Sequence, residues 1–320
     1  MTLPAQTAPA PTGPAPRPAG RRAGGPRPAR RAGYLPYLVP GALIFIAVIA
    51  IPLAVNIGIS FTRWDGVGTP DWVGIAQYRR LFADETFWRS SRNNLALILA
   101  MAVIPAFLGL LLAGALFDVV AKRVGQRPAN ALRAAFYLPQ VLPAAVAGIV
   151  WLWILHPDYG AANALLRFVG LDSFTQNWLG DESTALLSVM GVLVWIQIGY
   201  PVVIFMAGLQ RVDPELYESA ELDGASWWQK LWRITVPQIR PEIYVVMLTC
   251  TVAALKTFDK IYVLTRGGPG GATNVPAYFS WQNFFERSNV SYGAAIATVL
   301  TVIIVGLAVL FLRAQSKGEG

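Results

Sequence analysis

Apolar residues along this chain collect in six long runs, and most charged residues lie between these runs. A helix needs roughly 20 apolar residues to cross a hydrocarbon core about 30 Å thick. Runs of that length occupy residues 38–60, 95–117, 134–155, 185–209, 243–264 and 292–312. They lack the polar stripe at helical spacing that the helices of a large soluble protein show. The pattern therefore predicts an all-α, polytopic membrane protein with six transmembrane helices.

The composition supports a membrane protein. Charged residues make up only 14% of the chain and hydrophobic residues 55%, whereas a soluble domain is typically about a quarter charged. The net charge of +8 could indicate nucleic-acid binding, but six arginines lie in residues 1–33, together with eight prolines and no acid. Such a segment cannot bury enough apolar surface to fold, so we predict a disordered cytoplasmic tail and no nucleic-acid partner.

The tail is not a cleavable signal peptide, because the apolar run after it is too long and ends without an A-x-A-like site. With the tail inside, the inner segments hold 16 Lys and Arg and the outer segments hold 8. The positive-inside rule therefore places both termini in the cytoplasm. The predicted location is the plasma (inner) membrane, which the chain crosses several times in contact with lipid.

The sequence lacks the residues of a metal site or a catalytic centre. Cys250 and His156 are each the only residue of their kind, so neither an intrachain disulfide nor a usual zinc site can form. We interpret Cys250 as a small buried apolar residue and His156 as an interfacial one. The sequence lacks the G-x-x-x-x-G-K-[ST], G-x-S-x-G and H-E-x-x-H motifs. We therefore expect that this chain is not an enzyme and binds no cofactor of its own.

Three charged residues lie in the fifth apolar run, at Lys256, Asp259 and Lys260. They could pair with one another or reach the outer interface, and such residues often mark a transport path. A secondary carrier driven by an ion gradient remains an alternative, although we find no internal repeat of the kind such carriers contain.

A charged insert separates the fourth and fifth runs, at residues 210–238. Asp213 can cap a first helix, and Gly224 can supply the left-handed turn that ends it. Ser226 can cap a second helix, which Pro237 is expected to end. The small residues Ala220 and Ala225 permit the two helices to approach closely.

The second helix has an apolar face made of Trp227, Leu231 and Ile234, while Glu218 and Asp223 are left for the polar side. The insert could be an ordinary hairpin resting on the lipid headgroups. A DNA-reading helix-turn-helix is disfavoured, because the acidic first helix would repel phosphate. We interpret the insert as a docking element that passes force between a cytoplasmic partner and the spans.

The insert resembles a loop of the permease subunits of binding-protein-dependent ABC importers, which has the pattern E-A-A-x3-G-x9-I-x-L-P. The matching residues are Glu218, Ala220, Gly224, Ile234 and Pro237. The sequence departs from the pattern at Ser219 and Val236. The stretches "WVGIAQYRRLF", "YLPQVLPAAVAGIVWLWIL" and "TFDKIYVLTRGGPGGAT" are similar to the carbohydrate-uptake branch, and the resemblance runs from about residue 35 to the end.

The resemblance implies a six-helix permease domain at residues 34–320, with residues 210–238 as the loop that couples it to an ATPase. The implied partners are a second permease subunit, two ATP-binding subunits that hold ATP and Mg, an extracytoplasmic solute-binding protein and a sugar. In the coupling loop, Glu218 and Asp223 would face the ATPase. Ala220, Gly224 and Ala225 would keep the turn tight.

Neutral sugars are held by hydrogen bonds and by flat aromatic faces. Candidate residues for a sugar path are Gln140, Trp151, Trp195, Gln197, Tyr200, Lys256 and Asp259. The aromatic ones could instead be ordinary interfacial anchors. Trp64, Trp72 and Tyr78 in the first outer loop are candidates for contact with the solute-binding protein. An ABC permease for another solute, such as a polyamine or a phosphorylated polyol, remains an alternative, and the sequence does not name the sugar.

Overall fold

The computed structural model describes residues 35–120 and 125–318. The predicted disordered tail lies outside these residues. The chain divides into two parts, residues 1–51 and 52–320. In the first part, α1 (Leu35–Phe45) continues through a π-helical turn at Ile46–Ala50. Its large apolar side chains are exposed, as expected for a helix that faces lipid.

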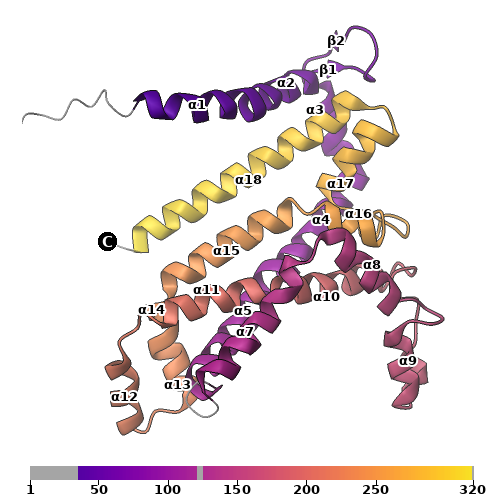
Figure 1. Ribbon diagram of the computed structural model, residues 1–320. Helices are drawn as coiled ribbons and strands as arrows, with labels where there is room; N and C mark the ends of the chain where they lie inside the picture. Colours follow the sequence, from indigo (N-terminus) through magenta and orange to yellow (C-terminus); the bar gives the residue numbers. More distant parts are fainter. Residues whose placement is uncertain (1–34, 121–124, 319–320) are drawn as a thin grey trace, which may run out of the picture. The chain divides into compact units, whose positions relative to one another are not determined.

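The second part is almost entirely helical (Figure 1). Its first half contains all but the first residue of α2 (Ile51–Ser60), and then β1 (Thr62–Arg63), β2 (Asp71–Trp72), α3 (Ala76–Ala83), α4 (Glu85–Ile98), α5 (Ile104–Gly114), α7 (Gln126–Val141), α8 (Ala144–Ile154) and α9 (Ala161–Phe168). Its second half contains α10 (Ala185–Gln197), α11 (Gly199–Leu209), α12 (Pro214–Leu222), α13 (Trp227–Lys230), α14 (Val236–Gln238), α15 (Arg240–Leu255), α16 (Asp259–Leu264), α17 (Pro276–Trp281) and α18 (Val290–Gly318). The two strands form a short antiparallel hairpin.

Four helices in the described residues are long and apolar enough to cross a membrane. They are Tyr37–Ser60, Glu85–Phe117, Ala185–Leu209 and Val290–Gln315. A fifth candidate is a bent pair, Asn130–Val141 and Ala144–Ile154, whose axes differ by 97°. The chain is therefore an all-α, polytopic membrane protein, as predicted, apart from the short hairpin.

The prediction of an uninterrupted helix is wrong for the third and fifth apolar runs. In the third, Pro143 has no N–H and forces Leu142 into extended backbone, with ψ 133°. In the fifth, α15 ends at Leu255 and a new helix starts at Asp259. The charged residues of this run thus lie at a helix interruption and not inside a continuous span.

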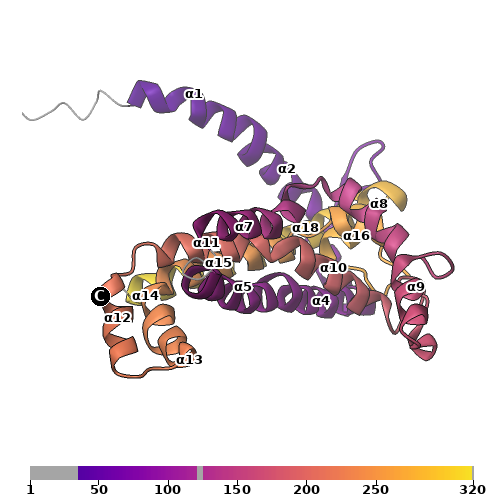
Figure 2. The ribbon, with the colours of Figure 1, turned by 60° about the horizontal axis from the view of Figure 1, so that its bottom comes forward.

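Glycines let the helices of the second part approach closely. In α11, Gly199 packs on the backbone of Phe136 and Tyr137 in α7, and a Cβ atom there would lie 2.6 Å from Tyr137 Cα. In α5, Gly109 packs against Pro201 in the same way. Small residues commonly permit such contacts between helices in membranes. Figure 2 shows these helices grouped around α11 and α15.

We expect Gly199→Ala to lower the free energy of unfolding by about 1–3 kcal/mol, because α7 and α11 must separate to admit the methyl group. Thermal unfolding of the purified chain in detergent measures the change. Gly191→Ala is the matched control, since its Cβ would meet no atom within 4 Å. Equal melting temperatures for the two variants would show that the Gly199 contact is not tight.

Asp84 joins two helices at one end of the bundle. Its side chain caps α4 by accepting a hydrogen bond from Thr86 N at 2.8 Å, and it accepts another from Tyr292 Oη of α18 at 2.6 Å. Partial burial acts to raise the pKa of the Asp84 carboxyl, but the hydrogen bonds from Tyr292 and Thr86 outweigh it and hold the pKa below its usual value.

A lowered pKa makes this contact sensitive to acid. The stabilisation by Asp84 is fully present above the unfolded-state pKa of about 4 and is lost as the pH falls through the lower folded-state pKa. We expect Asp84→Asn to lower the free energy of unfolding by about 1 kcal/mol near neutral pH. Below a pH of about 4, the stability of the variant should fall less steeply with pH than that of the wild type. Melting temperatures of both proteins across this range test the prediction. A decline of equal steepness in both would contradict it.

Candidate functional site

The charged insert folds as a helical hairpin, with the predicted caps in place. Asp213 accepts a hydrogen bond from Glu215 N at 3.0 Å and caps α12, in which Pro214 takes the first position. Ser226 caps α13 in a reciprocal capping box with Gln229. These local predictions are confirmed.

The turn between the two helices depends on Gly224. Its φ is +74°, a left-handed conformation that costs glycine nothing. Gly224 N donates to Glu221 O at 3.1 Å, and Ala225 N donates to Ala220 O at 2.9 Å. These two bonds form a Schellman motif, so Ala220 and Ala225 meet as predicted.

The prediction that Pro237 ends the second helix is wrong. After α13 the helix continues through a π-helical turn at Leu231–Thr235 and through α14 to Gln238. A proline inside a regular helix would lose one hydrogen bond and clash with the preceding turn. Here the wider π-helical turn places Pro237 in the first turn of α14, where its missing N–H is tolerated.

The second helix of the hairpin packs onto the ends of the membrane helices. Leu231 is buried and Trp227 half-buried, in a cluster that includes Leu209 of α11. A Cβ atom on Gly114 of α5 would lie 3.3–3.4 Å from these two side chains. Ile234 is half-buried but is not part of this cluster, so only two of the three residues of the predicted apolar face anchor the helix there.

Polar contacts tie the hairpin together and fix its base. Lys230 Nζ pairs with Glu221 Oε1 at 2.7 Å, which links the two helices. Tyr217 Oη and Thr235 Oγ1 are 2.9 Å apart and form a second link. At the base, Arg211 forms an ion pair with Glu242 of α15, a side chain that is nearly buried. The hairpin is therefore braced internally by side-chain contacts and attached at its base to α15.

The far surface of the hairpin is open to a partner. Glu218 and Asp223 are exposed, and their carboxylates make no hydrogen bond or ion pair with any described residue. Leu222 beside them is 90% exposed, and Trp228 and Trp232 are also exposed. Exposed apolar and acidic side chains in one region are typical of a docking surface.

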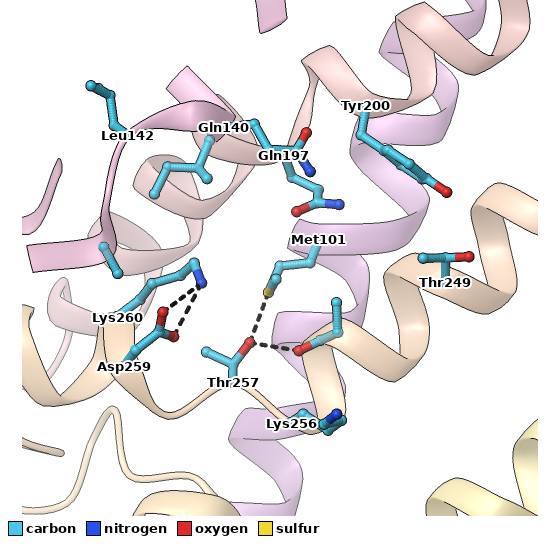
Figure 3. Close-up of a pocket in the computed structure, with 13 residues that line it drawn as sticks. Met101, Gln140, Leu142, Gln197, Tyr200, Thr249, Lys256, Thr257, Asp259 and Lys260 are labelled. Atoms are coloured by element: carbon cyan, nitrogen blue, oxygen red, sulfur yellow. Dashed lines mark hydrogen bonds and ion pairs between the residues drawn. The ribbon is translucent and has the colours of Figure 1, made fainter. Parts of the chain in front are cut away.

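A pocket of about 410 Å³ lies between the membrane helices (Figure 3). The lining residues are Met101, Gln140, Leu142, Ala144, Ile196, Gln197, Tyr200, Thr249, Ala253, Lys256, Thr257, Asp259 and Lys260. Two helix interruptions meet at this pocket, between α7 and α8 and between α15 and α16, and the junction of α10 with α11 lies beside them. Interrupted helices within a membrane are tolerated where they line a polar cavity, and they commonly mark a substrate site.

Several polar groups of the pocket are available to a ligand. Gln140 Oε1 is buried and has no hydrogen-bond partner among the described residues. Gln197 Nε2 donates to Cys250 Sγ at 3.2 Å, which leaves its oxygen toward the pocket. Lys260 pairs with Asp259 at 3.1 Å, whereas Lys256 has no ion-pair partner in the described part of the chain. The volume suits a small organic solute.

Five of the residues predicted for a sugar path line this pocket: Gln140, Gln197, Tyr200, Lys256 and Asp259. The structure does not bring Trp151 and Trp195 to it. Their rings pack edge to face on each other at 5.4 Å, beside the lining. Sequence reasoning missed Thr249 and Thr257 as lining residues, although a polar residue in an apolar run was a signal that could have found them.

The remaining candidates make the following contacts within the protein. Trp72 stacks on Phe61 with ring centroids 5.7 Å apart, and Tyr78 Oη bonds Ser60 Oγ at 2.5 Å. Trp64 lines a second pocket of about 350 Å³. Cys250 is buried, as interpreted, and His156 stacks on Tyr159. Within residues 35–120 and 125–318, no cluster of His, Cys, Asp and Glu could hold a metal ion.

Comparison with known proteins identifies the family. Residues 120–316 match the family described as "Binding-protein-dependent transport system inner membrane component". The chain belongs to this family. Its helical interruptions and its hairpin are thus features of a transport-system membrane component.

Individual relatives in this family are named as ABC transporter permeases. The chain is 34% identical to "Probable ABC transporter permease protein YurN" of Bacillus subtilis, over 88% of this chain and 96% of the relative. It is 31% identical to "Diacetylchitobiose uptake system permease protein NgcF" of Streptomyces coelicolor, over 95% of this chain and 90% of the relative. The chain is an ABC transporter permease of this family and a multi-pass membrane protein.

Its fold is also that of a solved permease. A chain in the structure of a bacterial ABC transporter involved in the import of alginate superposes with a TM-score of 0.76 and 22% identity. The match covers 89% of this chain and 96% of that one. At this identity the similarity establishes the fold.

Proposed function

We propose that the chain is one of two membrane-spanning subunits of an ABC importer that carries a sugar or sugar derivative into the cell. The observation that carries the proposal is the polar pocket at which the two helix interruptions meet. Support comes from the family and from relatives whose names print a sugar or a polysaccharide, diacetylchitobiose and alginate among them.

The hairpin of α12 and α13 is the proposed contact with a separate ATP-binding subunit. Two such subunits hold ATP and Mg, and this chain supplies no catalytic residue. Glu218, Asp223 and Leu222 offer the docking surface. Movement of the hairpin passes through Leu231 to α5 and α11, and through the Arg211–Glu242 ion pair to α15. Both paths lead to helices that line or support the pocket.

The proposed topology has six membrane passes and both termini in the cytoplasm. α15 has 16 residues, which corresponds to about 24 Å of helix. Together with α16 it is proposed to form an interrupted pass, the fifth along the chain, which brings the four long helices and the bent α7–α8 pair to a total of six. The other partners are a second, related permease and an extracytoplasmic solute-binding protein, and the location is the plasma membrane.

The unpartnered oxygen of Gln140 gives a direct test of the pocket. We expect Gln140→Leu to raise the KM for sugar uptake by up to about tenfold, the cost of one lost hydrogen bond. Uptake by membrane vesicles measures the change. Trp195→Phe is the control, because Trp195 lies outside the lining and should leave the KM unchanged. An unchanged KM in Gln140→Leu would place the sugar elsewhere.

An ABC permease for a phosphorylated polyol is a second candidate. It is favoured by Lys256 and Lys260, which bring two positive charges to the lining against one carboxylate at Asp259. Uptake assays with a phosphorylated and an unphosphorylated polyol would separate the two candidates. Preference for the phosphorylated compound over every neutral sugar would favour the second one.

A further inference from the structure

The short helix α9 and the turn after it expose a row of large apolar side chains. These residues, here called the α9 patch, are Leu165, Phe168, Val169, Leu171 and Phe174. Leu165 and Phe168 are three residues apart and share one face of the helix. Phe168 is 88% exposed. An apolar patch of this size on a protein surface normally meets another apolar phase.

The opposite side of α9 is fixed to the rest of the protein by Asn163. Its buried amide donates to Pro157 O at 2.9 Å and to Gln176 O at 3.0 Å, and its oxygen accepts from Trp178 Nε1 at 2.8 Å. These bonds hold α9 between the end of α8 and the segment that leads to α10. The α9 patch is therefore presented outward by a rigid element and is not the product of a loose loop.

We propose that the α9 patch lies in the outer membrane–water interface, with its side chains among the lipid acyl chains and α9 parallel to the bilayer. The patch follows directly on other exposed apolar side chains, those of α8. In α8, Ile149 is 59% and Trp153 73% exposed, and Tyr159 follows just before α9. Trp and Tyr are the residues that mark the interface. Figures 1 and 2 both show α9 beyond the end of α8, at the edge of the second part.

The charges of the segment fit this orientation. The α9 patch has no charged member, and Arg167 turns its guanidinium back to Pro157 O at 3.3 Å. Asn163 and Arg167 thus lie on the side of α9 that faces the protein, and the side with the patch carries apolar residues only. Asp172 is exposed next to the patch and can stay in the hydrated headgroup layer.

The lone cysteine makes a site-specific test possible. Cys250→Ser removes the thiol but keeps an acceptor for Gln197, and Phe168→Cys on that background places one nitroxide label on the patch. The full chain, with the subunits that co-purify with it, is reconstituted in phospholipid vesicles. We then compare two collision rates of the label. One is with oxygen, which concentrates in hydrocarbon, and the other is with a water-soluble nickel chelate. Ile149→Cys, on the exposed apolar surface of α8, is the apolar control, and Asp71→Cys, on the exposed strand β2, is the aqueous control.

The proposal predicts an oxygen-to-nickel ratio at position 168 close to that at position 149 and several-fold above that at position 71. When the label is moved through positions 161–168, the oxygen-to-nickel ratio should vary with a helical period and be lowest at position 167. A ratio at position 168 equal to that at position 71 would overturn the proposal. If that ratio rises only when a solute-binding protein is added, the α9 patch is a protein-docking surface and the proposal is wrong. Neither result depends on which sugar is carried.

Discussion

Gly224→Val is expected to reduce ATP-driven uptake about tenfold or more while leaving the melting temperature of the permease nearly unchanged. At φ +74°, a β-branched residue is strained by about 1–2 kcal/mol, and the Schellman turn between α12 and α13 opens. A Cβ atom at this position would meet no atom within 4 Å, so the spans themselves are not disturbed. The measurement is uptake and ATP hydrolysis by the reconstituted complex.

Gly224→Asn is the matched control. Asparagine adopts the left-handed conformation more readily than other residues, so the turn should be kept and most uptake should remain. Equal loss in Asn and Val variants would indicate that the side chain itself blocks docking. Full uptake in the Val variant would contradict the role of the hairpin as a rigid coupling element.

Leu231→Ala is expected to destabilise the permease by about 2–5 kcal/mol and to separate ATP hydrolysis from uptake. Leu231 is 2% exposed and joins the hairpin to the cluster of α5 and α11, so its loss leaves a cavity at the point where force is passed on. Hydrolysis should continue while uptake falls, because the docking surface at Glu218 and Asp223 is untouched.

Trp232→Ala is the control for stability. Trp232 lies next to Leu231 in the same π-helical turn but is 47% exposed, so its removal should leave the melting temperature almost unchanged. A similar fall in melting temperature for both variants would show that the buried contact of Leu231 is not what holds the hairpin to the bundle.

The features that could be predicted from the sequence depend on local rules. Asp213, Gly224 and Ser226 each fulfil a cap or turn requirement set by their own backbone, and the structure confirms all three. The long apolar runs likewise indicate membrane helices from length alone. Gln197 and Tyr200 are three residues apart, so helical spacing predicts that they share a face, and both line the pocket.

What could not be predicted depends on tertiary packing. Pro143 signals a break, but no local rule gives the 97° bend of α7 against α8 or the packing of Gly199 on α7, which is distant in sequence. Trp151 and Trp195 fit a sugar path by residue type, yet they pack on each other instead. The continuation of the helix through Pro237 required a π-helical turn, which no spacing rule signals.

The central claim is that this chain moves its solute with energy from ATP on partner subunits. The most direct test is uptake of labelled mono- and disaccharides by proteoliposomes that contain the full complex and the solute-binding protein. The account predicts uptake only with ATP on the side of the hairpin, and its loss in Gly224→Val. Uptake that persists without nucleotide and follows an imposed proton or sodium gradient would contradict the account.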